Sequence, residues 1–94
     1  MIRLYLVCIQ WASEGEKAQP TEAVMDRLGR AVRLQPGVYL LASYQALPEV
    51  LETVGESLDG EDRLFVAPIH EYGAKRLAGP IKSLIDAAWH PDRI

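Results

Sequence analysis

Short apolar runs separated by polar stretches containing glycine or proline dominate the pattern along this chain of 94 residues. Residues 2–10 (IRLYLVCIQ) and 38–44 (VYLLASY) are apolar at both alternating sets of positions, which predicts strands that are covered on both faces. Residues 30–35 carry charges, and residues 63–69 contain Pro68, which cannot donate a ladder hydrogen bond. The pattern therefore predicts two central strands and two edge strands.

A helical repeat separates the first two strands. Apolar positions recur at helical spacing over residues 21–28, with Thr21 as the N-cap and Gly29 ending the helix in the left-handed conformation. The dipeptide Pro36-Gly37 then predicts a tight turn between paired strands, hence a β-hairpin. An alternative interpretation extends this helix to Leu34, because glycine is a weak helix breaker.

Two further helices follow from the same periodicity. Pro48 begins the second helix and Gly60 ends it. Its apolar stripe consists of Leu47, Leu51, Val54 and Leu58. Residues 70–78 are expected to be irregular, and a third helix is predicted over residues 80–89.

The order strand, helix, strand, strand, helix, strand is the split βαβ arrangement. It predicts an α+β, ferredoxin-like βαββαβ domain over residues 1–69, with a four-stranded antiparallel sheet and two helices on one face. Residues 70–94 are predicted to be a C-terminal extension with a short helix at 80–89. A chain of this length forms a single domain overall.

In this fold the second face of the sheet has no helix of its own, and exposing an apolar face to water is costly. The candidates for that face are Tyr5, Val7 and Ile9 with either Tyr39 and Leu41 or Val38 and Leu40; the dimer-interface prediction takes Tyr5, Val7, Ile9, Tyr39 and Leu41. A second copy on a two-fold axis covers such a face economically, which predicts a homodimer. The C-terminal helix is the rival cover, folded back in cis or exchanged in trans.

Composition bounds the environment of the protein. With 49% hydrophobic and 24% charged residues the chain is typical of globular domains, and its net charge of −3 gives no general attraction to nucleic acid or anionic membranes. Residues 2–11 are too few to span a bilayer, so no membrane partner is expected. The single cysteine, Cys8, cannot form an internal disulfide, which predicts a reducing, cytoplasmic location.

Side chains that could perform catalysis are sparse and scattered. Cys8 lies within a strand with no evident base beside it and is expected to act as a core hydrophobe. His70 and His90 lack the spacing of a zinc site and are expected at the surface. The acidic run 59–62 lacks the length and alternation of a calcium loop. The sequence therefore predicts no metal site and no cofactor.

Two groups of charged residues remain as candidates. Glu14 and Glu16 are weak catalytic candidates, because loops beside strand ends often host active sites. The basic residues available for phosphate contacts are Arg27, Arg30 and Arg33, with Arg3, Lys75 and Arg76 elsewhere. The first three are the candidates for binding nucleic acid, although a solvated, salt-bridged surface is the usual role of such residues.

The segment from Leu28 to Ile69 resembles the CRISPR-associated protein 2 superfamily and its free-standing relatives. In those proteins a hairpin of the type R-x-Q-x-S-V-[FYW] follows the first helix, and the second helix leads to a D-x-L strand. The matching residues here are Arg33, Gln35, Gly37, Val38 and Tyr39, then Asp62, Arg63, Leu64 and Val66. The similarity covers residues 1–69.

The resemblance implies a symmetric dimer that is either a metal-dependent nuclease or a scaffold for a DNA-integrating partner. The proposed nuclease members carry an aspartate at the end of the first strand, because a divalent ion there needs hard oxygen ligands. This chain has the neutral Gln10 at that place. The family also often adds a fifth strand that is exchanged across the dimer, whereas residues 80–89 are predicted to be helical.

The favoured hypothesis is thus a non-catalytic, homodimeric binding or scaffold protein for a protein partner or nucleic acid. One alternative is a degenerate metal-dependent nuclease that uses Glu14 or Glu16 in place of the missing aspartate. Another is a small-molecule-binding regulatory module, because ferredoxin-like dimers often form ligand pockets at their interfaces.

Overall fold

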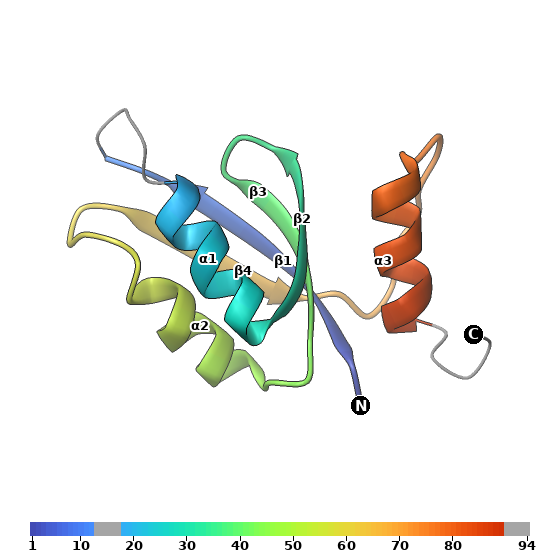
Figure 1. Ribbon diagram of the computed structural model, residues 1–94, viewed down its shortest axis with the longest axis horizontal. Helices are drawn as coiled ribbons and strands as arrows, with labels where there is room; N and C mark the ends of the chain where they lie inside the picture. The colour runs from blue at the N-terminus through green and yellow to red at the C-terminus, as the bar shows by residue number, and fades with distance from the viewer. Residues whose placement is uncertain (13–17, 90–94) are drawn as a thin grey trace.

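A four-stranded antiparallel sheet forms the centre of the structure, a computed structural model that describes residues 1–12 and 18–89 (Figure 1). Its strands are β1 (Arg3–Gln10), β2 (Gly29–Gln35), β3 (Val38–Ser43) and β4 (Arg63–Pro68). Their order across the sheet is β2-β3-β1-β4, and every neighbouring pair is antiparallel. The ferredoxin-like fold is confirmed, with the two apolar strands in the middle and the two more polar strands at the edges.

Two helices, α1 (Ala18–Leu28) and α2 (Leu47–Gly55), cover one face of the sheet (Figure 1). The main core lies between them and the sheet. Its buried members are Tyr5, Val7, Ile9, Met25, Tyr39, Leu41, Val50 and Val54. Each such side chain contributes about 1.5–3 kcal/mol by leaving water, so this layer supplies most of the hydrophobic stabilisation of the domain.

This core overturns the predicted dimer interface. Tyr5, Val7, Ile9, Tyr39 and Leu41 are at most 7% exposed and lie beneath α1 and α2, so they cannot meet a second subunit. The prediction failed because the central strands are apolar on both faces, and alternation alone does not say which face the helices cover. The tyrosine hydroxyls also find partners inside the subunit: Tyr5 donates to the carbonyl oxygen of Gln45 over 2.7 Å, and Tyr39 to Glu22.

The other face is partly covered by the C-terminal helix, α3 (Gly79–Trp89), of the same chain (Figure 1). Leu84 and Ile85 are buried against Leu4 and Leu40, and α3 lies over β1, β2 and β3. The helix extends over the residues where the sequence predicts one. Of the two ways in which it could cover the sheet, the structure has the cis arrangement.

The turn between β2 and β3 follows the prediction, whereas the end of α1 does not. Gly37 has φ = 80°, the left-handed conformation that a Pro-Gly turn requires at its second position. Gly29, by contrast, has no positive φ and is the first residue of β2, where a Cβ atom would overlap the carbonyl oxygen of Ala42 on β3. The glycine therefore permits close strand pairing, and the alternative of a helix continuing to Leu34 is wrong.

The helix boundaries also differ from the predicted ones. Thr21 does not cap α1, which begins three residues earlier; Thr21 is buried and its hydroxyl accepts a 3.1 Å hydrogen bond from Ser57, which ties α1 to the end of α2. Helix α2 ends at Gly55 instead of Gly60. At its start, the Glu49 carboxylate accepts the backbone N–H of Ala46, as in a capping box. Within the described residues, no helix is both long and apolar enough to cross a bilayer.

Candidate functional site

The part of the second sheet face that α3 leaves open carries an apolar row across three strands. Cys8 on β1 pairs with Val38 on β3 and with Phe65 on β4. Cys8 stands two and four residues beyond Leu6 and Leu4, which pack with α3, so the three side chains share the face of α3. Phe65 is 61% exposed, and Cys8 and Val38 are half-buried. We call these three residues the outer row.

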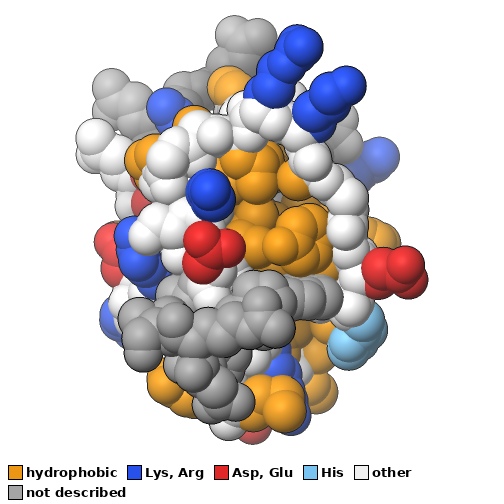
Figure 2. All heavy atoms as spheres, turned by 90° about the vertical axis from the view of Figure 1, so that its right-hand side faces the viewer, with side chains coloured by type: hydrophobic (Ala, Val, Ile, Leu, Met, Phe, Trp, Pro, Cys, Tyr) orange, Lys and Arg blue, Asp and Glu red, His pale blue; other side chains and the backbone are white. Residues whose placement is uncertain are grey.

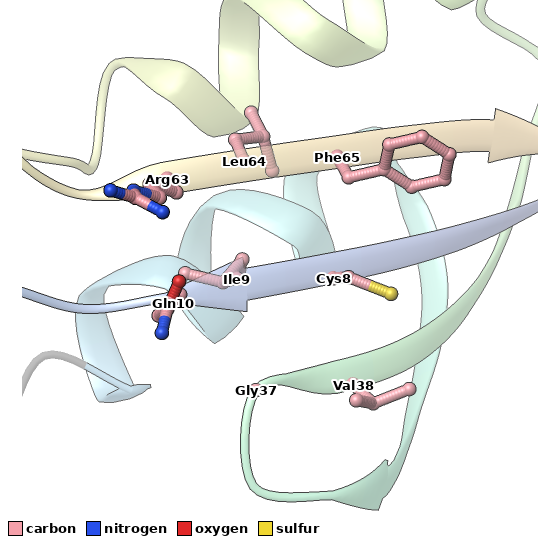
Figure 3. A pocket seen from close by; sticks show the side chains of 8 residues that line it. All are labelled: Cys8, Ile9, Gln10, Gly37, Val38, Arg63, Leu64 and Phe65. Atoms are coloured by element: carbon pink, nitrogen blue, oxygen red, sulfur yellow. The ribbon is translucent and has the colours of Figure 1, made fainter.

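A shallow hollow of about 250 Å³ adjoins the outer row (Figure 3). It is lined by Cys8, Ile9, Gln10, Gly37, Val38, Arg63, Leu64 and Phe65. In Figure 3 the Phe65 ring projects from β4 at one end, and the polar side chains of Gln10 and Arg63 lie at the other. The backbone N–H of Ile9 donates a 2.7 Å hydrogen bond to the carbonyl oxygen of Gly37, which holds these two lining residues close together. An exposed aromatic knob thus stands beside a depression on the same face.

The end of β1, where the nuclease-type members of the resembled family carry an aspartate, has a neutral side chain with a cation on the neighbouring strand. Gln10 is neutral and pairs across the sheet with Arg63 on β4. A guanidinium on the neighbouring strand disfavours a divalent metal ion, which carboxylate oxygens attract most strongly. Neighbouring Asp62 is committed elsewhere, because its two carboxylate oxygens accept the backbone N–H groups of Ala12 and Asp59 at 2.7 and 2.8 Å.

The three arginines predicted to contact nucleic acid are not brought together on one face. Arg27 lies in the last turn of α1. On the edge strand β2, Arg30 pairs with Ala42, on the face of α3, whereas Arg33 pairs with Tyr39, on the face of α1 and α2. A phosphate backbone that follows one face of the sheet would therefore not meet Arg30 and Arg33 together.

The structure adds little about the other residues that the sequence offers as candidates for a functional site. Glu14, Glu16 and His90 lie outside the described residues, and His70 is exposed after β4. Over residues 1–12 and 18–89, the structure shows no group of three or more histidine, cysteine, aspartate or glutamate side chains that could hold a metal ion. The sequence interpretation did not single out Phe65. The signal that could have found it is its place in an otherwise alternating edge strand, directly across the sheet from Cys8.

One partly buried polar pair on the helix-covered face makes the stability of the fold depend on pH. The hydroxyl of Tyr39 donates a 2.9 Å hydrogen bond to Glu22. Burial, then this hydrogen bond and the negative charge of Glu22, raise the pKa of Tyr39 to about 12, while Arg33 lowers it. The folded state therefore holds the phenolic proton more tightly than the unfolded chain, in which the pKa is about 10. This stabilisation is complete below pH 10 and is lost as the pH rises towards 12.

We therefore expect Tyr39→Phe to flatten the alkaline limb of the stability curve. Between pH 10 and 12 the free energy of unfolding of the wild type should fall by about 1 kcal/mol more per pH unit than that of the variant. Urea titrations followed by circular dichroism measure both slopes. Tyr44→Phe, at a side chain that is 71% exposed, is the matched control and should keep the wild-type slope. Equal slopes for the wild type and Tyr39→Phe would contradict the assignment.

Fold and site together define an α+β ferredoxin-like protein with a third helix packed in cis and a partly open outer sheet face. No protein-family model matches the chain, and no curated protein is significantly similar to it in sequence.

Proposed function

We propose that this protein is a non-catalytic, homodimeric binding protein whose two subunits meet through the outer row. The observation that carries the proposal is the 61% exposure of Phe65 beside a hollow on the same face. About a two-fold axis, the knob of each subunit enters the hollow of the other, so one surface serves both subunits. A second copy of the chain would thus supply both the knob and the hollow that this proposed interface needs.

The expected dimer is modest in size. Helix α3 already packs on Leu4 and Leu40, so the apolar surface left for a partner centres on the row of Phe65, Cys8 and Val38. Stable interfaces usually bury about 800 Å² on each subunit. Because the open apolar surface is small, we expect a dissociation constant in the micromolar range, at which dilution shifts the equilibrium.

The absence of catalysis is proposed from Gln10 and Arg63. The neutral amide of Gln10, with a guanidinium on the neighbouring strand, does not supply the negative charge of the aspartate that binds metal in a metal-dependent nuclease. Single- and double-stranded RNA and DNA should therefore stay intact on incubation with the protein and magnesium or manganese. Metal-dependent cleavage that Glu14→Gln or Glu16→Gln abolishes would revive the nuclease alternative.

The bound partner is proposed to be a protein and not a nucleic acid. The chain carries a net charge of −3, and Arg27, Arg30 and Arg33 do not share a face. Electrostatic binding of nucleic acid needs several cations that act on one backbone. We expect no retardation of DNA or RNA at low salt. Retardation that Arg30→Ala weakens would favour the nucleic-acid alternative.

The single thiol is a built-in reporter of the dimer. Cys8 lies in the middle of the outer row, is half-buried in the isolated subunit and is the single cysteine of the sequence. Dimerisation should bury the Cys8 thiol further. At protein concentrations above the dissociation constant, the thiol should therefore react with Ellman's reagent about tenfold more slowly than at high dilution. A free thiol at this place also suits a reducing compartment, and we place the protein in the cytoplasm.

The control for this experiment is a subunit that cannot dimerise. Phe65→Asp should react at one rate that does not depend on protein concentration, because its thiol is never covered by a second subunit. If the wild-type thiol also reacts at the same rate at every protein concentration from about 1 µM to about 1 mM, the outer row does not join two copies.

A further inference from the structure

A second hollow, of about 400 Å³, lies between residues 70–78 and helix α3. Its lining consists of Tyr72, Ala74, Lys75, Arg76 and Leu77 from the connecting segment and Lys82, Ile85 and Asp86 from the helix. Figure 2, which looks onto the α3 side of the molecule, shows hydrophobic side chains gathered in a recess with both basic and acidic side chains around it. Its volume is in the range of small-molecule sites, about 300–1,000 Å³.

The floor of this hollow is apolar and anchored. Ile85 is 5% exposed and belongs to the cluster that holds α3 on the sheet, so its position is fixed by packing. Tyr72 and Leu77 remain 41% and 37% exposed, an unusual degree for two large apolar side chains that line one recess. The floor can therefore accept an apolar body without rearrangement of the sheet.

The rim is positive, although the chain as a whole is negative. Lys75, Arg76 and Lys82 line the hollow with one carboxylate, Asp86, which leaves a local net charge of +2 in a chain of net charge −3. A recess with low-dielectric walls concentrates such a field. The hollow is therefore complementary to an anion that also carries apolar surface.

Two of these cations occupy positions that local stability disfavours. Arg76 has φ = 58°, a left-handed conformation that costs a residue with a side chain about 1–2 kcal/mol. Lys82 lies in the first turn of α3, and that turn contains no acidic residue. Positive charge is unfavourable at this end of a helix because of the helix dipole. Neither Arg76 nor Lys82 is favoured at its position by local stability. Both nevertheless bring positive charge to the same rim, as a binding site for an anion requires.

We infer that this hollow binds a small organic anion: a carboxylate, sulfonate or phosphate group attached to an apolar body. The apolar body would lie against Tyr72, Leu77 and Ile85, and the anionic group would meet Arg76 and Lys82. The inference is independent of the proposed dimer, because the outer row contributes no residue to this hollow.

The first test uses 8-anilinonaphthalene-1-sulfonate, which combines an aromatic body with a sulfonate. We expect saturable fluorescence enhancement by the folded protein with one site per chain, and an affinity that falls as salt increases. N-phenyl-1-naphthylamine, which lacks the sulfonate, should bind at least about fivefold more weakly. Equal affinity for the two probes would show a merely apolar surface and overturn the inference.

Variants separate the charge from the fold. Arg76→Gly should weaken sulfonate binding about fivefold, while its thermal midpoint stays the same or rises, because glycine accepts the left-handed conformation. Lys82→Gln should weaken binding similarly. Arg27→Gln, at an exposed cation on α1, is the matched control and should leave binding unchanged. Unchanged affinity in both Arg76→Gly and Lys82→Gln would contradict the site.

Competition identifies the source of the anion. Displacement of the probe by decanoate would assign the site to an acyl carboxylate, and displacement by adenosine monophosphate to a phosphate monoester. Displacement by neither at millimolar concentration would overturn the inference. Phe65→Asp must retain probe binding; loss of the fluorescence in that variant would move the site to the outer row and contradict the assignment to α3.

Discussion

Replacing Phe65 by aspartate should convert the proposed dimer into a monomer. The change places a carboxylate where an aromatic ring otherwise enters the hollow of the other subunit, so the cost of desolvating the charge and the loss of the apolar contact both oppose association. We expect the dissociation constant to rise by about 100-fold or more. Because Phe65 is 61% exposed in the subunit, its loss should change the free energy of unfolding of the monomer by about 0.5 kcal/mol at most. Sedimentation equilibrium of the wild type and the variant measures the shift.

Leu51→Asp is the matched control for this prediction. Leu51 is also a large exposed apolar side chain, at 46%, but it lies on α2, on the opposite side of the sheet from the outer row. The same charge introduced there should leave the dimer intact. If Leu51→Asp dissociates the dimer and Phe65→Asp does not, the subunits meet through the helix layer and not through the outer row.

The largest effect on stability is expected for Gly37→Ala. The residue has φ = 80°, which costs alanine about 1–2 kcal/mol, and its new Cβ atom would overlap the carbonyl oxygen of Ile9 on the neighbouring strand. Since that contact is with backbone, the β1–β3 pairing must shift to relieve it. We expect a loss of about 3 kcal/mol or more in the free energy of unfolding, and a fall of about 15 °C in the thermal midpoint.

Gly60→Ala provides the comparison, because a Cβ atom there would meet nothing within 4 Å and the backbone has no positive φ. This variant should unfold within about 0.5 kcal/mol of the wild type. Equal stabilities of Gly37→Ala and Gly60→Ala would mean that the turn can relax without disturbing the sheet, and would contradict the tight packing of Gly37 against β1.

Local chemistry made the hairpin and the strand order predictable. Pro36 and Gly37 have the residue types that a tight turn demands, and Pro68 restricts its segment to an edge. These signals act over a few residues, so they survive in the sequence. Gly29 misled because glycine serves two purposes, a left-handed helix end or a close backbone approach, and only the position of the neighbouring strand distinguishes them.

The faces of the central strands could not be assigned in this way. Strand β1 is apolar on both sides, so Tyr5 and Cys8 were equally good candidates for either layer until the packing of α1, α2 and α3 was known. Because of this ambiguity, the residues predicted for the dimer interface were the wrong ones. The cis packing of α3 covers part of the outer face of the sheet, and Phe65 on β4, not Tyr5, is the large apolar side chain that is exposed there.

The subunits' association through the outer row is tested most directly by the molar mass of the untagged protein in solution. Light scattering after gel filtration, over loading concentrations from about 5 to 500 µM, should give a mass that rises towards twice the 10.5 kDa of one chain. The same measurement on Phe65→Asp should give the mass of one chain throughout. A wild-type mass of 10.5 kDa at every concentration would contradict the proposed dimer.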